Sequence, residues 1–531
     1  MPLLIYNSLS RQKEAFQPIH AETEQVSVPS PQAGNRLGQV LMYVCGVTVY
    51  DYCHLGHART YVVWDMVRRY LTFLGYRVKF VQNFTDIDDK ILQRALERQE
   101  SMTDLAERFI QAYFEDMDRL NILRADNYPR ATQSLSSIFA LIQSLELKQF
   151  AYRIRVNHTP TNPTEQSDVY YAVRQFGDYG QLSGRKLEDM QAGASGRVDS
   201  IGSVAQKRDP FDFALWKSAP QTEPGFDSPW GWGRPGWHIE CSAMVKETLG
   251  NSIDIHAGGA DLIFPHHENE LAQSEPILGK PLARYWMHNG FLNINGEKMS
   301  KSLGNFTTLR DALKVYDPMA LRLFFLQTHY RSPIDLTETA MAAASQGWQT
   351  LSKGMQAAHH FLSSLHPQPD HSPPSEPFAS DQINRSKSES VKQFQSAMDD
   401  DFATPAGVAL AFDLAKELSR QYNLLTHQGE ARLPHNLLLQ KSQDLLQITE
   451  VLGLGLEDQP PIEENVEATI QVAIETGEKI NVSELIEQRK QAKKERNFAE
   501  ADRIRNHLKS LGISLIDQPD GSTRWRQGDS P

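Results

Sequence analysis

The chain has 531 residues, of which 40% are hydrophobic and 23% are charged, and its formal net charge is -12. This length indicates about three or four domains with a substantial core. The acidic total excludes a basic surface over the whole protein, so any nucleic-acid contact must be local. Three cysteines exclude a disulfide framework and favour a reducing, cytoplasmic compartment. We expect neither a secretory leader nor a membrane span, because the apolar runs are too short.

The first predicted elements form a parallel βαβ unit. Apolar spacing and the glycines that interrupt it predict a buried strand over 39–50, a helix over 57–74 and a second strand over 76–83. Such a unit is typical of an open α/β fold, in which ligands bind at the carboxyl ends of the strands. Cys45, the turn before the helix and Thr85 fall at such ends.

The later segments have other patterns. Residues 126–235 are irregular and are predicted to be an insertion, with one strand over 170–173. Strand and helix signals then resume, and the chain is predicted to be helical from residue 307. The remaining predicted elements are helices over 391–422 and 436–452, a helical hairpin over 483–511 and a β-hairpin that turns at Asp520-Gly521.

A four-residue turn, His54-Leu55-Gly56-His57, joins the first strand to the helix. The start of a helix carries unpaired N–H groups and a partial positive charge, which attract phosphate. Gly56 allows a nucleotide to approach the backbone, and two imidazoles can donate hydrogen bonds to phosphate oxygens. Histidine and glycine are also common in ordinary turns, so this motif alone leaves both interpretations open.

A second polar loop, Lys298-Met299-Ser300-Lys301-Ser302, follows an Asn-Gly turn. Two lysines three residues apart place positive charges on flexible stems, which suits a polyphosphate. An exposed loop with incidental lysines is the alternative when this segment is taken by itself.

Two cysteines, a histidine and a glutamate form a candidate zinc site. Cys45 ends the first strand, Cys241 lies in GWHIEC, and His266 and Glu270 belong to PHHENE. Residues i and i+4 project from one face of a helix, and two thiolates, an imidazole and a carboxylate suit Zn²⁺. Buried cysteines beside a polar helix start are the alternative. We assign the remaining cysteine, Cys53, to packing beside the HLGH turn.

HLGH followed by an intact KMSKS resembles the two signatures of the class I aminoacyl-tRNA synthetases. The segments YVCGVTVYD, HLGHARTYVVWD, NFTDIDDKI, GRPGWHIECSAM, FPHHENE and AMDDDFATP narrow this resemblance to the cysteinyl-tRNA synthetases, over nearly the whole chain. The resemblance implies an enzyme that activates L-cysteine with ATP and Mg²⁺ to cysteinyl-adenylate and pyrophosphate. It then transfers the cysteine to the 3′-terminal adenosine of its tRNA.

The resemblance also implies a role for each site residue. The catalytic residues are His54 and His57 at the α-phosphate, and Lys298 and Lys301 at the leaving pyrophosphate. The other implied sites are ATP contacts at Gly56, His256, Gly258, Gly259, Met299, Ser300 and Ser302, a cysteine pocket of Thr85, Trp237 and Asp261, and one zinc ion on Cys45, Cys241, His266 and Glu270.

Zinc would select cysteine over serine, which differs from it by one atom. A hydrophobic pocket separates such similar side chains by only ~1–3 kcal/mol. Zinc binds a deprotonated thiol at ~2.3 Å, and a hydroxyl gains little from such a contact. Because four protein ligands usually close a zinc site, we expect the shell to expand or Glu270 to loosen.

The predicted fold is a Rossmann-like α/β catalytic domain with a parallel sheet and an insertion, followed by an α-helical bundle and a small C-terminal α+β domain. With the roles that the resemblance implies, the predicted domains are the first catalytic half (1–125), the connective insertion (126–235), the second catalytic half (236–306), a stem-contact region (307–345), the helical bundle (346–460) and an anticodon-binding domain (461–531).

The C-terminal domain is the predicted reader of the tRNA anticodon. Its net charge changes from -6 over residues 461–487 to +4 over residues 488–531. The alternative for the charge change is a solvated helix of mixed charge, and the alternative for Trp525 is a core residue of the hairpin. The candidate phosphate contacts and the candidate base-stacking residue are Arg489, Lys493, Lys494, Arg496 and Trp525.

Some features depart from the family pattern or leave rivals. Val47 stands where the family usually has proline, and residues 21–36, 193–206 and 364–377 look like longer loops of unknown role. A ligase that transfers cysteine to an amino sugar lacks an anticodon domain, so the basic tail favours tRNA. A non-catalytic zinc and RNA-binding protein need not keep both signatures, and a short HxGH nucleotidyltransferase has no KMSKS. We expect a monomer.

Overall fold

The structure is a computed structural model of the chain. It describes residues 2–19, 37–156, 166–189, 207–298, 307–364, 388–456, 471–473, 479–494, 497–510, 513–517 and 523–527. The chain divides into two compact units, of which the first comprises residues 1–418 and 435–455 and the second comprises residues 419–434 and 456–531. None of the described helices is long and apolar enough to cross a membrane.

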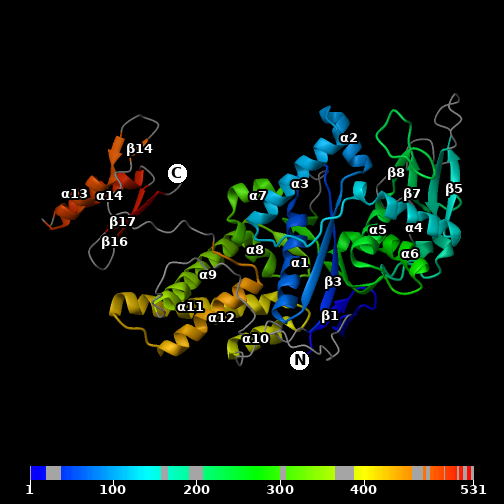
Figure 1. Cartoon of the computed structure of the whole chain (residues 1–531). Coiled ribbons are helices and arrows are strands. Elements are labelled where there is room, and N and C mark those ends of the chain that lie inside the picture. The colour runs from blue at the N-terminus through cyan, green and yellow to red at the C-terminus, as the bar shows by residue number, and fades with distance from the viewer. Residues whose placement is uncertain are drawn as a thin grey trace, which may run out of the picture. The chain divides into compact units, whose positions relative to one another are not determined.

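A four-stranded parallel sheet in the order β10-β9-β3-β4 forms the centre of the first unit (Figure 1). Helix α1 (Leu55–Phe73) connects β3 to β4, and α6 (Glu268–Leu278) lies between β9 and β10. The predicted α/β fold is confirmed, and the first strand, helix and second strand end within two residues of the predicted positions. The strands are β3 (Gln39–Thr48), β4 (Arg77–Thr85), β9 (Ile253–Gly259) and β10 (Ala283–Asn289).

The two predicted halves of the α/β domain meet where β3 pairs with β9. Met42, Tyr43 and Val44 lie opposite Ile255, His256 and Ala257 in this parallel pair. Each half contributes its own βαβ crossover on its side of this pair, so the strand order reverses here. Ligands of open α/β sheets bind beyond the carboxyl ends of the strands at such a switch point. The turn that carries HLGH follows β3, and Gly258-Gly259 ends β9.

A separate antiparallel sheet, in the order β5-β6-β7-β8, lies between β4 and β9 in the chain. The prediction of a strand over 170–173 was wrong at its ends, because β6 covers Gln166–Tyr171 and Val173 begins a 3-10 turn. Three consecutive polar residues at the start of β6, Gln166, Ser167 and Asp168, hid its true length from the sequence. The other elements of this region are α2 (Asp89–Arg98), α3 (Met102–Arg119), α4 (Leu135–Leu147), β5 (Ala151–Val156), β7 (Phe213–Ser218), β8 (Gly233–Pro235) and α5 (Trp237–Leu249).

A small three-stranded sheet is formed by strands that come before and after the KMSKS loop in the chain. Its order is β12-β11-β13, and β11 pairs in parallel with β13. Between residue 307 and the C-terminal domain the sequence predicted only helix, so β13 was missed, because a three-residue strand has no readable period. The elements are β11 (Leu292–Ile294), β12 (Glu297–Lys298), α7 (Leu309–Val315), α8 (Pro318–Leu326) and β13 (Ile334–Leu336).

Long helices follow β13. The predicted continuous helical pattern over 391–422 was wrong, because α10 ends at Met398 and α11 begins at Thr404. Asp401 and Phe402 interrupt it with positive φ angles of 58° and 54°, which a helix excludes. The helices are α9 (Glu338–Ser364), α10 (Glu389–Met398), α11 (Thr404–Gln428) and α12 (His435–Val451), and a hairpin of β1 (Leu4–Asn7) and β2 (Gln12–Ala15) begins the chain.

The second unit contains the predicted helical hairpin and β-hairpin. Helices α13 and α14 pack on one another, and β16 pairs antiparallel with β17. The predicted turn at Asp520-Gly521 lies outside the described residues. The elements are β14 (Gln471–Ala473), β15 (Lys479–Asn481), α13 (Val482–Lys494), α14 (Phe498–Ser510), β16 (Ile513–Asp517) and β17 (Thr523–Gln527).

Candidate active site and metal centre

The HLGH turn caps the helix that follows it. His57 N–H donates to His54 Nδ1, and His54 N–H donates to His57 Nδ1, both at 3.3 Å. The two rings stack with their centroids 3.6 Å apart. A neutral imidazole that accepts at Nδ1 carries its proton on Nε2. The cap therefore fixes a tautomer in which both residues have an Nε2–H donor.

The His57 imidazole lies in surroundings that oppose positive charge. Burial, and secondarily the neighbouring His54, lower the pKa of His57 well below its usual value. His57 is therefore neutral at physiological pH. A neutral Nε2–H can donate a hydrogen bond to an anion without first taking up a proton.

The residues on either side of the KMSKS segment are held by hydrogen bonds of their backbone groups. On one side, Thr308 forms an antiparallel bridge with His54, and Leu309 N–H donates to the Cys53 carbonyl at 2.7 Å. On the other side, Gly296 N–H donates to Asp335 Oδ1 at 2.9 Å. The backbone of Lys298 lies in β12, whereas Met299, Ser300, Lys301 and Ser302 lie outside the described residues. The described chain that follows the segment is thus attached directly to the HLGH turn and the residue before it.

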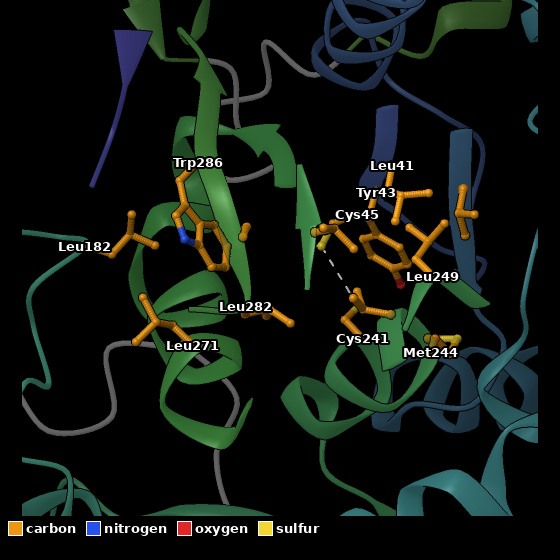
Figure 2. Close-up of a cluster of buried hydrophobic side chains, with 14 residues drawn as sticks. Leu41, Tyr43, Cys45, Leu182, Cys241, Met244, Leu249, Leu271, Leu282 and Trp286 are labelled. Atoms are coloured by element: carbon orange, nitrogen blue, oxygen red, sulfur yellow. Dashed lines mark hydrogen bonds between the residues drawn. The ribbon is translucent and has the colours of Figure 1, made fainter. Parts of the chain in front are cut away.

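The structure brings the four predicted zinc ligands together. Cys45 lies near the end of β3 and faces Cys241 on α5, with their sulfurs 3.9 Å apart (Figure 2). Glu270 Oε1 lies 3.4 Å from Cys45 Sγ and 3.0 Å from His266 Nε2. All four ligand atoms lie within 4.8 Å of one another.

These distances and this donor set fit a zinc ion. Tetrahedral zinc with ligands at ~2.0–2.3 Å separates its ligand atoms by about 3.3–3.8 Å. Two sulfurs, one nitrogen and one carboxylate oxygen are a borderline-soft set that zinc accepts. Cys53 is also buried, but it is not among the candidate metal ligands.

The candidate metal ligands shift one another's pKa values. A hydrogen bond from Cys45 lowers the pKa of the Cys241 thiol to about 6, although burial opposes this. Burial alone would lower the pKa of His266, but Glu270 and Cys241 raise it to about 9. Burial would raise the pKa of Glu270, but His256 and His266 hold it well below its usual value. The cluster therefore already favours an anionic sulfur and an anionic carboxylate.

A second layer of histidines surrounds these ligands. His256 Nε2 lies 2.9 Å from Glu270 Oε2, and His267 Nε2 lies 3.3 Å from Cys45 Sγ. His267 Nδ1 also lies 2.7 Å from His288 Nε2. Sequence reasoning did not single out His267 or His288. The adjacent histidines of PHHENE were the only available signal, because strand register rather than sequence spacing brings His288 close.

The comparisons with known proteins agree with this geometry. The sequence matches the family described as tRNA synthetases class I (C) catalytic domain over residues 32–346, and the DALR domain over residues 393–457. The cysteine–tRNA ligase of Synechococcus sp. (strain JA-3-3Ab) is 64% identical over 526 residues, which cover 99% of each chain. The chain belongs to the cysteine–tRNA ligase family. The cysteine–tRNA ligase of Gloeothece citriformis (strain PCC 7424) is 54% identical to this chain, and the match covers 99% of this chain and 100% of that protein.

A solved structure supports the fold of the ligase. The Mycobacterium tuberculosis methionyl-tRNA synthetase in complex with methionyl-adenylate superimposes with a TM-score of 0.52, at 16% sequence identity. The match covers 78% of this ligase and 89% of that chain. At this identity the likeness concerns the fold alone.

The predicted cysteine-pocket residues of the ligase lie on three different elements. Trp237 is the first residue of α5, and its ring lies 4.2 Å from that of His266. Thr85 ends β4 and is buried, and its carbonyl accepts from Val49 N–H at 3.1 Å. Asp261 follows β9 and is exposed. Of the three, the tryptophan is the one in direct ring contact with a candidate metal ligand.

The predicted adenosine residues lie at and before the end of β9. The ring of His256 is buried and stacks on Trp286, with centroids 4.4 Å apart. A Cβ atom at Gly258 would lie 2.9 Å from the His267 ring. The glycine at this position is therefore required by the histidine layer, and the adenosine roles stay predictions.

The predicted tRNA contacts lie in the second unit. Arg489 is 4% exposed, whereas Lys493 on the same helix is exposed. The side chains of Lys494 and Trp525, and all of Arg496, lie outside the described residues. Among the described candidates, Lys493 is the one whose position suits a phosphate contact.

Proposed function

We propose that this ligase activates L-cysteine with ATP and transfers it to the 3′-terminal adenosine of tRNA-Cys, with zinc selecting the amino acid. One observation carries the proposal. Four zinc-type ligand atoms converge within 4.8 Å beside the strand that leads into the HLGH turn. This observation supports a thiol site and a phosphate site at the same edge of the sheet, where ligands of open α/β sheets bind.

The HLGH turn supplies donors to the ATP phosphates. In the activation step, a carboxylate oxygen of cysteine bonds to the α-phosphorus, the bond to the β-phosphate oxygen breaks, and pyrophosphate leaves with Mg²⁺. The fixed Nε2–H groups of His54 and His57 would donate to the oxygens where charge develops. Lys298 and Lys301 would hold the pyrophosphate, so Lys301→Ala is expected to abolish exchange of pyrophosphate into ATP.

Cys45, Cys241, His266 and Glu270 would hold the zinc ion. When bound, zinc would take the substrate thiolate as a further ligand and discriminate against the serine hydroxyl. Glu270 is suited to loosen, because its other oxygen already has a partner in His256 at 2.9 Å. Trp237, whose ring lies 4.2 Å from that of His266, would close one side of the cysteine pocket, together with Thr85 and Asp261.

The remaining proposals concern the regions that bind tRNA, the cellular compartment and the oligomeric state. The second unit would bind the anticodon through Lys493 and the basic residues near it, and the helices after β13 would support the tRNA stem. We further propose a cytoplasmic monomer. The three cysteines are unpaired and buried, which suits a reducing compartment, and light scattering would test the monomer.

Pyrophosphate exchange with each of the twenty amino acids, combined with metal analysis, tests this function. We expect exchange with cysteine, one zinc per chain and loss of exchange when zinc is removed. Cys241→Ser should reduce the zinc content and the preference for cysteine over serine. Cys53→Ala is the matched control, because this buried cysteine lies outside the candidate ligand groups. A Cys241→Ser enzyme with full selectivity would show that the metal is not the filter.

A further inference from the structure

One buried polar group beside the metal centre has no role in the proposed function, namely the hydroxyl of Tyr43. The side chain is completely buried. Its oxygen completes no hydrogen bond of ordinary geometry among the described residues, whereas burial and then the neighbouring Cys241 side chain raise the pKa of the phenol. Leaving a buried hydroxyl without a partner costs about 1–3 kcal/mol. Phenylalanine would fill the same volume without this cost, so the oxygen calls for a functional explanation.

Strand geometry directs the phenol toward the candidate metal ligands. Tyr43 and Cys45 are two residues apart on β3, so their side chains project from the same face. Both belong to one buried cluster with Cys241. Figure 2 shows the Tyr43 oxygen directed toward Cys241. His256 lies opposite Tyr43 in the neighbouring strand, with the ring centroids 5.3 Å apart, and holds the phenol in place.

The charge of the donor set indicates what a nearby O–H group would do. Two thiolates and a carboxylate carry three negative charges, one more than Zn²⁺ neutralises, and a substrate thiolate adds a fourth. A hydrogen bond to a charged acceptor is worth ~1.5–3 kcal/mol, and low dielectric strengthens it. A phenol supplies this bond without adding a charge of its own.

We propose that Tyr43 is a positioning residue for cysteine selection, whose hydroxyl donates a hydrogen bond to the Cys241 thiolate. This proposal rests on the proposed zinc function. By drawing electron density away from that sulfur, the hydroxyl makes the metal a better acceptor for the thiolate of the substrate. The proton stays on the phenol throughout.

Tyr43→Phe tests the proposal, because it removes one oxygen atom and keeps the packing of the ring. Cobalt(II) is substituted for zinc, since its thiolate charge-transfer band reports the electron density on sulfur. We expect the band to move to longer wavelength in Tyr43→Phe. Zinc affinity should fall about 10–100-fold, as for other residues that support metal ligands. The KM for cysteine should rise while the KM for ATP stays unchanged.

Tyr152→Phe is the matched control. Tyr152 is also buried, and its hydroxyl donates to Asp212 at 2.6 Å in the antiparallel sheet of the insertion. This change should lower stability without moving the cobalt band. A wild-type enzyme that shows no sulfur-to-cobalt band would overturn the zinc function itself. A normal wild-type band with an identical band and zinc affinity in Tyr43→Phe would overturn the role of Tyr43 alone.

Discussion

His54 and His57 cap the helix that they begin, each Nδ1 accepting the backbone N–H of the other residue at 3.3 Å. The same side chains therefore serve a structural role at Nδ1 and have a donor left at Nε2. This division separates the capping role from the proposed catalytic role at the level of single atoms. It also means that alanine substitutions at these positions remove both roles at once.

The first prediction separates the two roles of His57. His57→Asn keeps an acceptor near the position of Nδ1 but has no donor at the position of Nε2, whereas His57→Ala keeps neither. Both variants should slow pyrophosphate exchange about 10²–10³-fold, as expected for loss of a donor to developing charge. Only His57→Ala should also lose about 1 kcal/mol of unfolding free energy, as measured in urea. Normal exchange by His57→Asn would show that Nε2–H is not the donor.

The second prediction concerns pH and His57. Burial and His54 lower the pKa of His57 in the folded state, whereas the unfolded chain protonates this residue near pH 6.5. The resulting stability is present above pH 6.5 and is lost as the pH falls below it. The unfolding free energy of the wild type should fall more steeply between pH 7.5 and 5.5 than that of His57→Asn, by up to about 1.4 kcal/mol per pH unit. Parallel curves would mean that His57 takes up its proton over the same pH range in the folded enzyme and in the unfolded chain.

The position of Cys45 at a strand end and the i, i+4 spacing of His266 and Glu270 indicated a candidate zinc site, and the family resemblance implied the full set of four ligands. Cys45 and Cys241 are 196 residues apart in sequence; Cys45 lies near the end of β3, whereas Cys241 lies inside α5. The histidine layer had no such signal. His288 on β10 contacts His267 only because the strand packs beside the turn that precedes α6. The sequence spacing of the two histidines has no periodicity that would predict this contact. Tyr43 likewise looked like one more apolar position in a buried strand.

The same limit explains the errors in the fold. A long apolar periodicity over 391–422 predicted helix, and the break depends on positive φ angles at Asp401 and Phe402. Neither residue is glycine, so residue type gave no warning. Tertiary contacts hold this conformation: Asp401 accepts from Tyr6 N–H at 2.9 Å and from Tyr330 Oη at 2.8 Å. Such long-range partners cannot be read from a local window.

The third prediction concerns a buried ion pair between α1 and α8. Arg322 and Asp65 contact one another and are 0% and 2% exposed. Arg322 also donates to the Leu452 carbonyl at 2.9 Å and so joins the end of α12 to α1. Asp65→Asn should lower the unfolding free energy by about 3–5 kcal/mol, because it leaves a buried charge without its counter-ion.

The matched comparison for that pair is Lys314 with Asp311, which lie 2.9 Å apart but are 72% and 59% exposed. Lys314→Met should change the unfolding free energy by less than about 1 kcal/mol. Urea denaturation of both variants checks the contrast. Equal effects would show that the Arg322 guanidinium reaches water when Asp65 is neutral.

The last prediction concerns the second unit. Helices α13 and α14 pack on one another through buried residues that include Ala492, Ile504 and Leu508, so this region has a small core of its own. A chain that ends at Pro460 should keep cysteine-dependent pyrophosphate exchange, because HLGH and the metal ligands belong to the first unit. Its charging of tRNA should fall, mainly through a higher KM for tRNA. Lys493→Ala in the full chain should cause a smaller change in the same direction, one that grows weaker at higher salt. Equal loss of exchange and charging on truncation would mean that the second unit supports the catalytic fold instead of binding tRNA.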